Sequence, residues 1–354
     1  MRVLVLTRYG YLGASSRMRF YQYLPYLQSR HVEIQVAPML DDEYISRLYA
    51  GKRASFFAMG RAYAHRLVRL ASAGSFDLLW VEKEVLPWLP AWAETLFDRL
   101  GIPYVVDYDD AVFHRYEMHA NPLVRTLLGK KIDDVMRHAA VVVSGNDYLA
   151  EHARRAGARR VEYLPTVVDL LRYSVERRSG QGFRIGWVGT PITAPNLGII
   201  QTALQEVGAQ SALRLVLVGA GSQDLLPGIE KEILPWSEES EVASIQSFDV
   251  GVMPLVDAPF ERGKCGYKLI QYMACGLPVI ASPVGVNTRI IDDGITGFLA
   301  SSSREWAAAM LKLSADPAMR SRLGNAGRQK IEQEYSLQVA APRLLDILES
   351  VLSG

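Results

Sequence analysis

Short apolar segments alternate with longer helical ones through the first half of this chain, and this alternation limits its fold more than any other feature. We expect strands at residues 2–6, 32–36, 78–81, 104–107, 140–144 and 161–164. Helical stretches such as residues 18–29 and 124–137 separate them. Strands in this order predict a parallel sheet with helices on both faces. Ligands of such sheets bind beyond the carboxyl ends of the strands.

The second half of the chain repeats the pattern. One expected strand runs into Gly189, another ends in a turn at Gly219 and Gly221, and two more lie in FDVGVMPL and PVIAS. Two strands that end in glycine within one half favour a second Rossmann-like unit. A chain of 354 residues is long enough for two domains. We therefore expect an α/β protein with domains at residues 1–168 and 169–335 and a charged linker at residues 170–181.

The composition is that of a soluble globular protein, with 49% hydrophobic and 22% charged residues. A net charge of +1 gives no general attraction to nucleic acid or membrane. The two cysteines, Cys265 and Cys275, fall on one expected helix roughly 15 Å apart, which is too far for a disulfide. No stretch approaches the ~20 apolar residues of a membrane span, and the N-terminus fits a first strand better than a signal peptide. We expect a cytoplasmic enzyme without a thiolate metal site.

Residues 264–275 are expected to form a helix that Gly276 closes. At 3.6 residues per turn, Lys264, Lys268 and Gln271 would share one face of this helix. Positive charge beside the unpaired N–H groups of a helix start suits an anion such as a phosphate. The alternative is an ordinary amphipathic helix with a solvated lysine face.

From Gln271 onward, the sequence QYMACGLPVIAS resembles the nucleotide-binding segment of the retaining glycosyltransferases of family 4, the group 1 type. In that family a Glu-x7-Glu element contacts the donor. Here Gly263 stands at its first position and Gln271 at its second, where an amide can still bond the ribose hydroxyls. Thr190 and Asn196 stand where the family has an arginine and a lysine that hold the donor diphosphate.

These departures imply that the charge facing the diphosphate comes from elsewhere. The nearest supply in the sequence is Arg262, Lys264 and Lys268. Preorganised cations and helix-terminal amides of this kind stabilise the charge that develops on a leaving diphosphate.

The resemblance extends over nearly the whole chain and implies both a fold and a function. The fold is GT-B, in which two Rossmann-like domains face each other across a cleft, the first binding the acceptor and the second the donor. The final helix, about residues 336–354, crosses back onto the first domain. The function is transfer of a sugar from a nucleotide-diphosphate sugar to a hydroxyl acceptor, with retention and without a metal or other cofactor. A UDP-sugar is favoured over a GDP-sugar, for bacterial polysaccharide, lipopolysaccharide or glycolipid synthesis.

Two alternatives to transfer stay open. A nucleotide-sugar epimerase of the same fold would need acid and base carboxylates around the sugar. A non-catalytic partner subunit that binds a glycan or a nucleotide would explain the missing glutamates and the missing Arg/Lys pair.

Two strand ends in the first half carry candidate residues. After the first strand, Gly13 allows a tight loop, and Arg17 and Arg19 on the following helix could receive a diphosphate. A purely structural turn is the alternative. After the fourth strand, Asp110 could bind an acceptor hydroxyl, and His114 is the nearest candidate for the histidine that the family places near the donor sugar. The alternative there is a pair of capping aspartates beside a surface histidine.

Together, the residues and the resemblance define an expected site without metal ligands. Its catalytic residues are Lys264, Lys268, Asp110 and His114. Its donor-binding residues are Gly13, Arg17, Gly189, Thr190, Trp236, Glu241, Arg262, Cys265, Gly266, Tyr267 and Gln271. Trp236 could equally be a core residue, and Glu241 could simply stabilise the start of its helix.

The segment from Arg47 to Ala73 is basic and aromatic. It has no acidic residue, and its basic residues are Arg47, Lys52, Arg53, Arg61, Arg66 and Arg69. The aromatic residues interleaved with them are Tyr49, Phe56, Phe57 and Tyr63. Such a segment could contact anionic lipid at the inner face of a membrane, with a lipid-linked glycan as acceptor. Nucleic acid is not expected as a partner, because no recognised nucleic-acid module accompanies the segment. The alternative is a helical pair that packs its aromatic residues inward.

Overall fold

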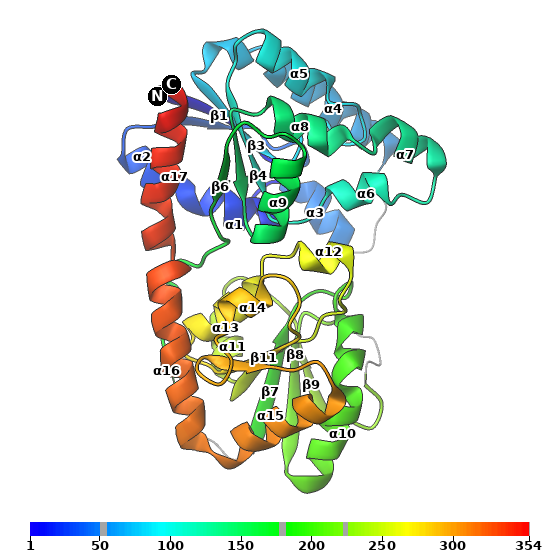
Figure 1. The fold of residues 1–354 in the computed structure, drawn as a ribbon, viewed down its shortest axis with the longest axis vertical. Helices are drawn as coiled ribbons and strands as arrows, with labels where there is room; N and C mark the ends of the chain where they lie inside the picture. Colours follow the sequence, from blue (N-terminus) through cyan, green and yellow to red (C-terminus); the bar gives the residue numbers. More distant parts are fainter. Residues whose placement is uncertain (50–54, 177–181, 222–225, 354) are drawn as a thin grey trace. The chain divides into compact units, whose positions relative to one another are not determined.

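The computed structural model describes residues 1–49, 55–176, 182–221 and 226–353, which form two compact units (Figure 1). Unit 1 consists of Met1–Thr166, Gly263–Cys265 and Ala340–Gly354, and unit 2 of Val167–Arg262 and Gly266–Val339. The division along the chain falls two residues before the expected boundary. The sequence did not predict that the short segment Gly263–Cys265 belongs to unit 1.

Unit 1 is built on a six-stranded parallel sheet. Its strands are β1 (Arg2–Leu6), β2 (Glu33–Val36), β3 (Leu78–Glu82), β4 (Tyr104–Tyr108), β5 (Val141–Ser144) and β6 (Val161–Tyr163). Their order in the sheet is β2-β1-β3-β4-β5-β6. The central strands β3, β4 and β5 are buried throughout, which fits their continuous apolar sequences and helices on both faces.

The helices of unit 1 follow the strands in the chain. They are α1 (Ala14–Arg19), α2 (Leu24–Ser29), α3 (Asp42–Tyr49), α4 (Phe56–Leu70), α5 (Trp92–Arg99), α6 (Phe113–Glu117), α7 (Pro122–Leu128), α8 (Lys131–His138) and α9 (Asp147–Arg155). The helix expected at residues 124–137 is two helices, α7 and α8, which part at Gly129. The stretch at 18–29 is likewise divided, because Pro25 in the first turn of α2 starts a new helix there.

Unit 2 repeats the architecture. Its strands are β7 (Phe183–Val188), β8 (Leu213–Val218), β9 (Lys231–Leu234), β10 (Val250–Met253), β11 (Val279–Ala281) and β12 (Gly297–Leu299). They form a parallel sheet in the order β12-β11-β10-β7-β8-β9. The sequence prediction of two Rossmann-like α/β units is confirmed by these two sheets. The cleft expected between them stays a prediction.

Two hydrophobic cores cover the faces of the sheet in unit 2. One contains Trp187 of β7 together with side chains of α10 (Gln201–Gln210) and α15 (Ser303–Ala315). The other contains Leu269 and Met273 of α13 (Tyr267–Ala274) together with Ile331 of α16 (Pro317–Glu334). The remaining helices are α11 (Glu241–Gln246), α12 (Pro259–Arg262), α14 (Asn287–Ile290) and α17 (Leu337–Leu352).

Helix α13 is shorter than expected, and this corrects the predicted lysine face. Gly266 has a left-handed backbone, with φ +65°, so the helix begins only at Tyr267. Lys264 therefore lies outside the helix, in the segment that belongs to unit 1. The expected face shared by Lys264, Lys268 and Gln271 does not exist. At the other end, Gly276 follows the helix with φ +73°, as predicted.

From Ala340 onward, the last helix of the chain belongs to unit 1. Arg343 of α17 donates to the carbonyl of Tyr163, at 2.8 Å, and Arg160 donates to the hydroxyl of Ser350, at 2.7 Å. The expected linker begins as a packed segment, because Tyr173 is buried. Its residues 177–181 lie outside the described residues.

A buried ion pair in unit 1 joins Arg19 of α1 to Asp107 of β4. Arg19 holds Asp107 with two hydrogen bonds, Nε to Oδ1 at 2.7 Å and an Nη to Oδ2 at 2.9 Å. Arg19 also donates to the carbonyl of Leu164, at 2.9 Å. Both charged side chains are 1% exposed. Because isolated charges are costly to bury, each partner depends on the other.

Candidate functional site

Three charged residues end β3 in unit 1, at the edge of the sheet where ligands are expected. Glu82, Lys83 and Glu84 are all buried. Lys83 has φ +64°, a left-handed conformation that costs free energy in a residue with a side chain. Sequence reasoning missed this cluster. The signal available was a run of three charges directly after a fully apolar strand.

The ammonium of Lys83 joins the ends of β1, β3 and β4. Its Nζ lies 2.7 Å from Oδ1 of Asp109, 3.6 Å from Oδ2 of Asp110 and 3.1 Å from Oγ of Ser15. Ser15 in turn donates a hydrogen bond to Asp109. The structure thus places predicted Asp110 in a charged cluster with three residues that sequence reasoning did not select.

The two aspartates differ in their proton affinity. Burial alone would raise the pKa of Asp109, but Lys83 and the Ser15 hydroxyl outweigh it and lower that pKa. Burial and the negative charge of Asp109 raise the pKa of Asp110, against the opposing effect of Lys83 and Lys264. When two adjacent carboxylates have different pKa values, one can stay ionised beside a cation while the other accepts a proton. Asp110 is the more basic of the two, and its side chain is 38% exposed.

The segment Gly263–Cys265 is fixed inside unit 1. The Asn146 side-chain amide donates to the carbonyls of Gly263, at 2.8 Å, and Lys264, at 3.1 Å. The thiol of Cys265 donates to the carbonyl of Asp109, at 2.9 Å. Cys265 was expected to bind the donor, but its side chain is buried and burial raises its pKa.

Gly263 packs so closely against Ala111 of unit 1 that no side chain fits at its position. A Cβ atom there would collide with the Cβ and backbone of Ala111. The glutamate that the family pattern has at this position would therefore not fit here. Asn146 also caps α9, since its side-chain oxygen accepts from the backbone N–H of Leu149 at 2.9 Å.

His114 lies on α6 with both ring nitrogens engaged. Nδ1 is 2.5 Å from Oε1 of Glu117, and Nε2 is 2.8 Å from the hydroxyl of Tyr148. Its side chain is largely covered. A role for His114 near a donor sugar therefore stays a prediction, without support from an open ring nitrogen.

The loop after β1 also differs from expectation. Arg19 is not available to a diphosphate, because Asp107 and the Leu164 carbonyl bind its guanidinium, so that interpretation of Arg19 is wrong. Arg17 is buried and donates to the carbonyl of Tyr11 at 3.3 Å. Gly13 packs against Tyr9, where a Cβ atom would collide with the tyrosine side chain. The loop is therefore firmly packed, and donor binding by Gly13 or Arg17 stays a prediction.

In unit 2, two glycines meet at the carboxyl ends of β7 and β8. The N–H of Gly189 donates to the carbonyl of Val218, at 3.0 Å. Gly219 has φ +76°, and a Cβ atom there would collide with the carbonyl of Gly189. Because of this close packing, neither position at this edge can carry a side chain. Thr190 follows directly and is exposed.

Lys268, in the first turn of α13, is linked to Gly189 through the ring of Trp187. Its Nζ is 4.5 Å from the ring centroid of Trp187, a cation–π contact. The same tryptophan ring lies against Gly189, where a Cβ atom would strike it. Arg262, the other expected cation, forms an exposed two-point pair with Asp257, at 2.6 and 2.9 Å. Of the expected cations, Lys268 is therefore the one placed at the strand ends of unit 2.

Gln271, expected to bind the ribose, is only 2% exposed. Its amide donates to the hydroxyl of Tyr173, at 3.0 Å, and this hydroxyl donates to Glu241, at 2.9 Å. Glu241 also accepts from the indole N–H of Trp236, at 2.7 Å. The Tyr267 hydroxyl lies 3.5 Å from that of Tyr173. This buried network engages the amide nitrogen of Gln271 and both carboxylate oxygens of Glu241, so direct ribose contacts by these two residues stay a prediction.

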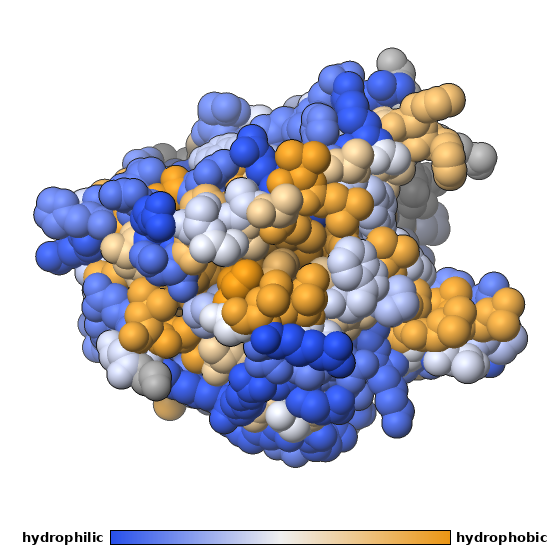
Figure 2. Space-filling view, turned by 90° about the horizontal axis from the view of Figure 1, so that it is seen from above, coloured by the Kyte–Doolittle hydropathy of each residue, from blue (hydrophilic) through white to orange (hydrophobic). Residues whose placement is uncertain are grey.

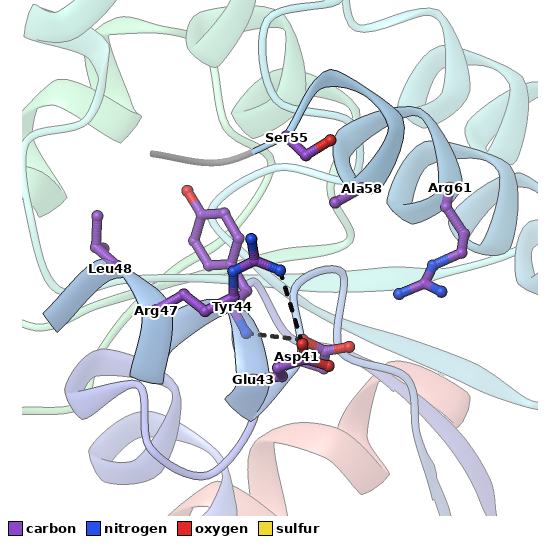
Figure 3. Close-up of a pocket in the computed structure, with 8 residues that line it drawn as sticks. All are labelled: Asp41, Glu43, Tyr44, Arg47, Leu48, Ser55, Ala58 and Arg61. Carbon is purple, nitrogen blue, oxygen red and sulfur yellow. Dashed lines mark hydrogen bonds and ion pairs between the residues drawn. The ribbon is translucent and has the colours of Figure 1, made fainter. Parts of the chain in front are cut away.

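A small cavity lies between α3 and α4, away from the strand ends (Figure 3). Tyr44, Arg47 and Leu48 line one side, and Ser55, Ala58 and Arg61 the other. Its volume is about 60 Å³, against the roughly 300 Å³ or more of a small-molecule site. We therefore assign it no ligand.

Two further properties concern only the described ranges. Within them, no group of three or more histidine, cysteine, aspartate or glutamate side chains is arranged to hold a metal ion. Nor does any helix there combine the length and apolar character that crossing a membrane requires.

Sequence comparison links unit 2 to a known family. Residues 182–316 match the family described as glycosyl transferases group 1. Over 94 residues the chain is 39% identical to alpha-maltose-1-phosphate synthase of Mycobacterium tuberculosis, covering 24% of each protein. Over 214 residues it is 24% identical to a GDP-mannose-dependent phosphatidylinositol monomannoside mannosyltransferase of Corynebacterium glutamicum, covering 53% of this chain and 56% of that protein. The matched stretches thus span from about a quarter to about half the length of these relatives.

Solved structures similar to this one cover the whole chain. HepE of Anabaena, solved in complex with UDP, has a TM-score of 0.74 at 16% identity, with 99% of this chain and 100% of HepE covered. Sucrose-phosphate synthase of Thermosynechococcus elongatus has a TM-score of 0.74 at 14% identity, with 100% and 99% covered. These likenesses show the fold, which is GT-B.

Proposed function

We propose that this chain moves a sugar from a nucleotide-diphosphate sugar to a hydroxyl acceptor, with retention at the anomeric carbon. The premise is that its residues 182–316 match the group 1 glycosyl transferases. We propose a UDP-sugar as donor, since HepE was solved with UDP and with UDP-glucose. A GDP-sugar is the alternative, because the Corynebacterium relative is described as GDP-mannose-dependent. The product would be a bacterial polysaccharide, lipopolysaccharide or glycolipid.

The observation that carries this proposal is the arrangement at the strand ends of unit 2. Gly189 and Gly219 leave bare backbone there, and Lys268, on the first turn of α13, is linked to the first of them through a tryptophan ring. The N–H groups of these glycines donate to the carbonyls of Val218 and Leu234, so the glycines contribute room rather than donors. The ammonium of Lys268 is the group that would bind a diphosphate oxygen there. As the bond from the anomeric carbon to the diphosphate breaks, negative charge grows on the leaving oxygen. Preorganised positive charge stabilises that change.

For the acceptor we propose the charged cluster of unit 1. The carboxylate of Asp110 would accept a hydrogen bond from the acceptor hydroxyl and orient its oxygen. Lys83, already bound to Asp109, would hold Asp110 in place and keep it ionised. The hydroxyl oxygen bonds to the anomeric carbon on the face that the diphosphate leaves. Its proton passes to the diphosphate oxygen, so no side-chain nucleophile is needed.

Nucleotide binding and sugar transfer test the proposal directly. UDP, GDP, ADP and CMP would be compared for their effect on the stability of the whole chain. At about ten times its dissociation constant, the right nucleotide should add about 1.4 kcal/mol to the free energy of unfolding. Release of that nucleotide from its sugar conjugate should then depend on an added acceptor.

The remaining outcomes separate the alternatives. Conversion of the nucleotide sugar to an isomer without an acceptor would identify an epimerase. Stabilisation by a nucleotide without any turnover of its sugar conjugate would indicate a non-catalytic subunit that binds nucleotide. No stabilisation by any nucleotide would leave a glycan-binding subunit, and in both cases the transferase proposal would fall.

Replacing Asp110 by asparagine should lower kcat/KM by roughly tenfold, the worth of one hydrogen bond to a charged group. In the parent protein kcat/KM should fall as the pH drops through the raised pKa of Asp110, since protonation removes the accepting carboxylate. Asp110→Asn should lose this acid limb. Lys83→Met should move it to higher pH, because it removes a cation that lowers the pKa of Asp110. The pH profile of kcat/KM measures all three.

A matched control for Asp110→Asn is Asp98→Asn, which removes a carboxylate of unit 1 that pairs with Arg159 and His138 instead. It should leave the profile unchanged. An acid limb that persists in Asp110→Asn would remove Asp110 from the mechanism.

A further inference from the structure

Three helices of unit 1 carry exposed apolar stripes. On α5 the stripe is Trp92, Leu96 and Leu100, counting the residue that follows the helix, and on α7 it is Leu123 and Leu127. Residues four apart share one face of a helix, so these are continuous stripes rather than scattered side chains. At the start of α4, Phe56 is 90% exposed and Phe57 88% exposed. The alternative that the aromatic residues of this segment all pack inward is therefore wrong for this pair.

Contacts within unit 1 tie these helices together. Tyr63 of α4 donates to the carbonyl of Pro87, just before α5. The N–H of the next residue, Trp88, donates to the hydroxyl of Tyr116 on α6, at 3.0 Å, and its ring packs edge-on against Tyr116. Arg125 of α7 donates to the carbonyl of His119, at 2.6 Å. In Figure 2, seen from above, hydrophobic residues gather on the visible face with hydrophilic residues around them. We call the exposed apolar residues of α4, α5 and α7 named above the helical face.

The charges around the helical face are mostly positive. Helix α4 has no acidic residue, and Arg61 and Arg69 are exposed on it. Arg99, Arg115, Arg125 and Lys130 are exposed on or beside α5, α6 and α7. The exposed acids Asp41 and Glu43 line the cavity that Arg61 of α4 also lines, and Glu43 pairs with Arg47. Glu117 is paired with His114, and Asp98 with Arg159. Arg66 takes no part, since it is buried and donates to the carbonyl of Thr7, and Lys52 and Arg53 lie outside the described residues.

From this combination we infer that the helical face docks on an anionic lipid bilayer. Aromatic and aliphatic side chains enter the boundary between headgroups and acyl chains, and arginines beside them meet anionic headgroups. Charge complementarity decides for lipid over a second copy of this chain, because two copies would bring like charges together. The inference does not depend on sugar transfer. Combined with the proposed function, it would bring unit 1 to an acceptor carried by the membrane.

Vesicle co-sedimentation tests the inference with the whole chain. Vesicles of phosphatidylcholine alone would be compared with an equal mixture of phosphatidylglycerol and phosphatidylcholine. We expect binding to the anionic mixture, weaker binding at higher salt, and little binding to phosphatidylcholine alone. The double variant Phe56→Ser/Phe57→Ser should bind at least about tenfold more weakly, because it removes two large apolar anchors.

Leu171→Ser is the matched control, since Leu171 is 89% exposed in unit 2 and should not affect binding. Three results would overturn the inference. They are no binding to anionic vesicles, unchanged binding by the double phenylalanine variant, and a wild-type dimer that this variant dissociates while vesicles have no effect. The last result would assign the helical face to a second copy.

Discussion

Replacing Lys268 by alanine is expected to lower kcat at least about a hundredfold, the usual effect of losing one group that stabilises transition-state charge. Its ammonium is held 4.5 Å from the ring of Trp187, which lies against Gly189. A cation held in place before the reaction costs little reorganisation as charge develops on the leaving diphosphate. The loss should therefore appear mainly in kcat, with a smaller change in the dissociation constant of the nucleotide.

Lys312→Ala gives the matched control for this prediction. Lys312 also lies over an aromatic ring of unit 2, 5.7 Å from the centroid of Phe298, but on α15. Its loss should leave kcat unchanged. A wild-type kcat in Lys268→Ala would show that the lysine only packs on tryptophan, and the diphosphate site would have to be sought elsewhere.

Replacing Arg19 by methionine is expected to destabilise the protein by about 3–5 kcal/mol, because it leaves the buried Asp107 carboxylate without its cation. Asp107 accepts two hydrogen bonds from Arg19, and both side chains are 1% exposed. The free energy of unfolding in urea measures the effect. The original sequence interpretation, in which Arg19 binds a diphosphate, predicts instead normal stability with weaker nucleotide binding.

A double variant shows whether the instability of Arg19→Met comes from the unpaired Asp107 carboxylate or from the packing of the lost arginine side chain. Arg19→Met combined with Asp107→Leu removes both charges and should recover much of the stability, since an apolar pair needs no compensation. If the double variant is no more stable than Arg19→Met alone, then the stranded carboxylate is not the cause.

The six strands of unit 1 could be predicted from the sequence to within one or two residues because their signal is local. In unit 2, β7, β8, β10 and β11 were expected, but the short strands β9 and β12 were not. Val141, Val142 and Val143 of β5, for example, are β-branched and buried on both faces. Asp110 could be selected for a similar reason, since it comes two residues after the buried strand β4 and so lies at the ligand edge of a parallel sheet.

Lys83 could not be selected in this way. Its importance depends on a left-handed backbone and on partners that follow two other strands, Ser15 on α1 and Asp109 after β4, and neither property is visible along the chain. The same holds for Gln271, which is covered by Tyr173, a residue 98 positions away. Contacts at such separation are set by the fold and leave no periodic trace in the sequence.

The error in the start of α13 has a local cause. Periodicity alone extended the helix back to Lys264, but Gly263 and Gly266 interrupt it, one by close packing and the other by its positive φ. Two glycines within four residues were the available warning.

Chemical labelling of the two cysteines can show when the parts of the fold around them open. Cys265 belongs to unit 1 and Cys275 to unit 2, and both thiols are buried. Burial also raises the pKa of Cys275 to about 12, so little reactive thiolate forms while the fold is closed. A thiol reagent applied under native conditions would therefore modify each cysteine only when its surroundings open. The order in which the two are labelled would then show which half of the molecule loosens first.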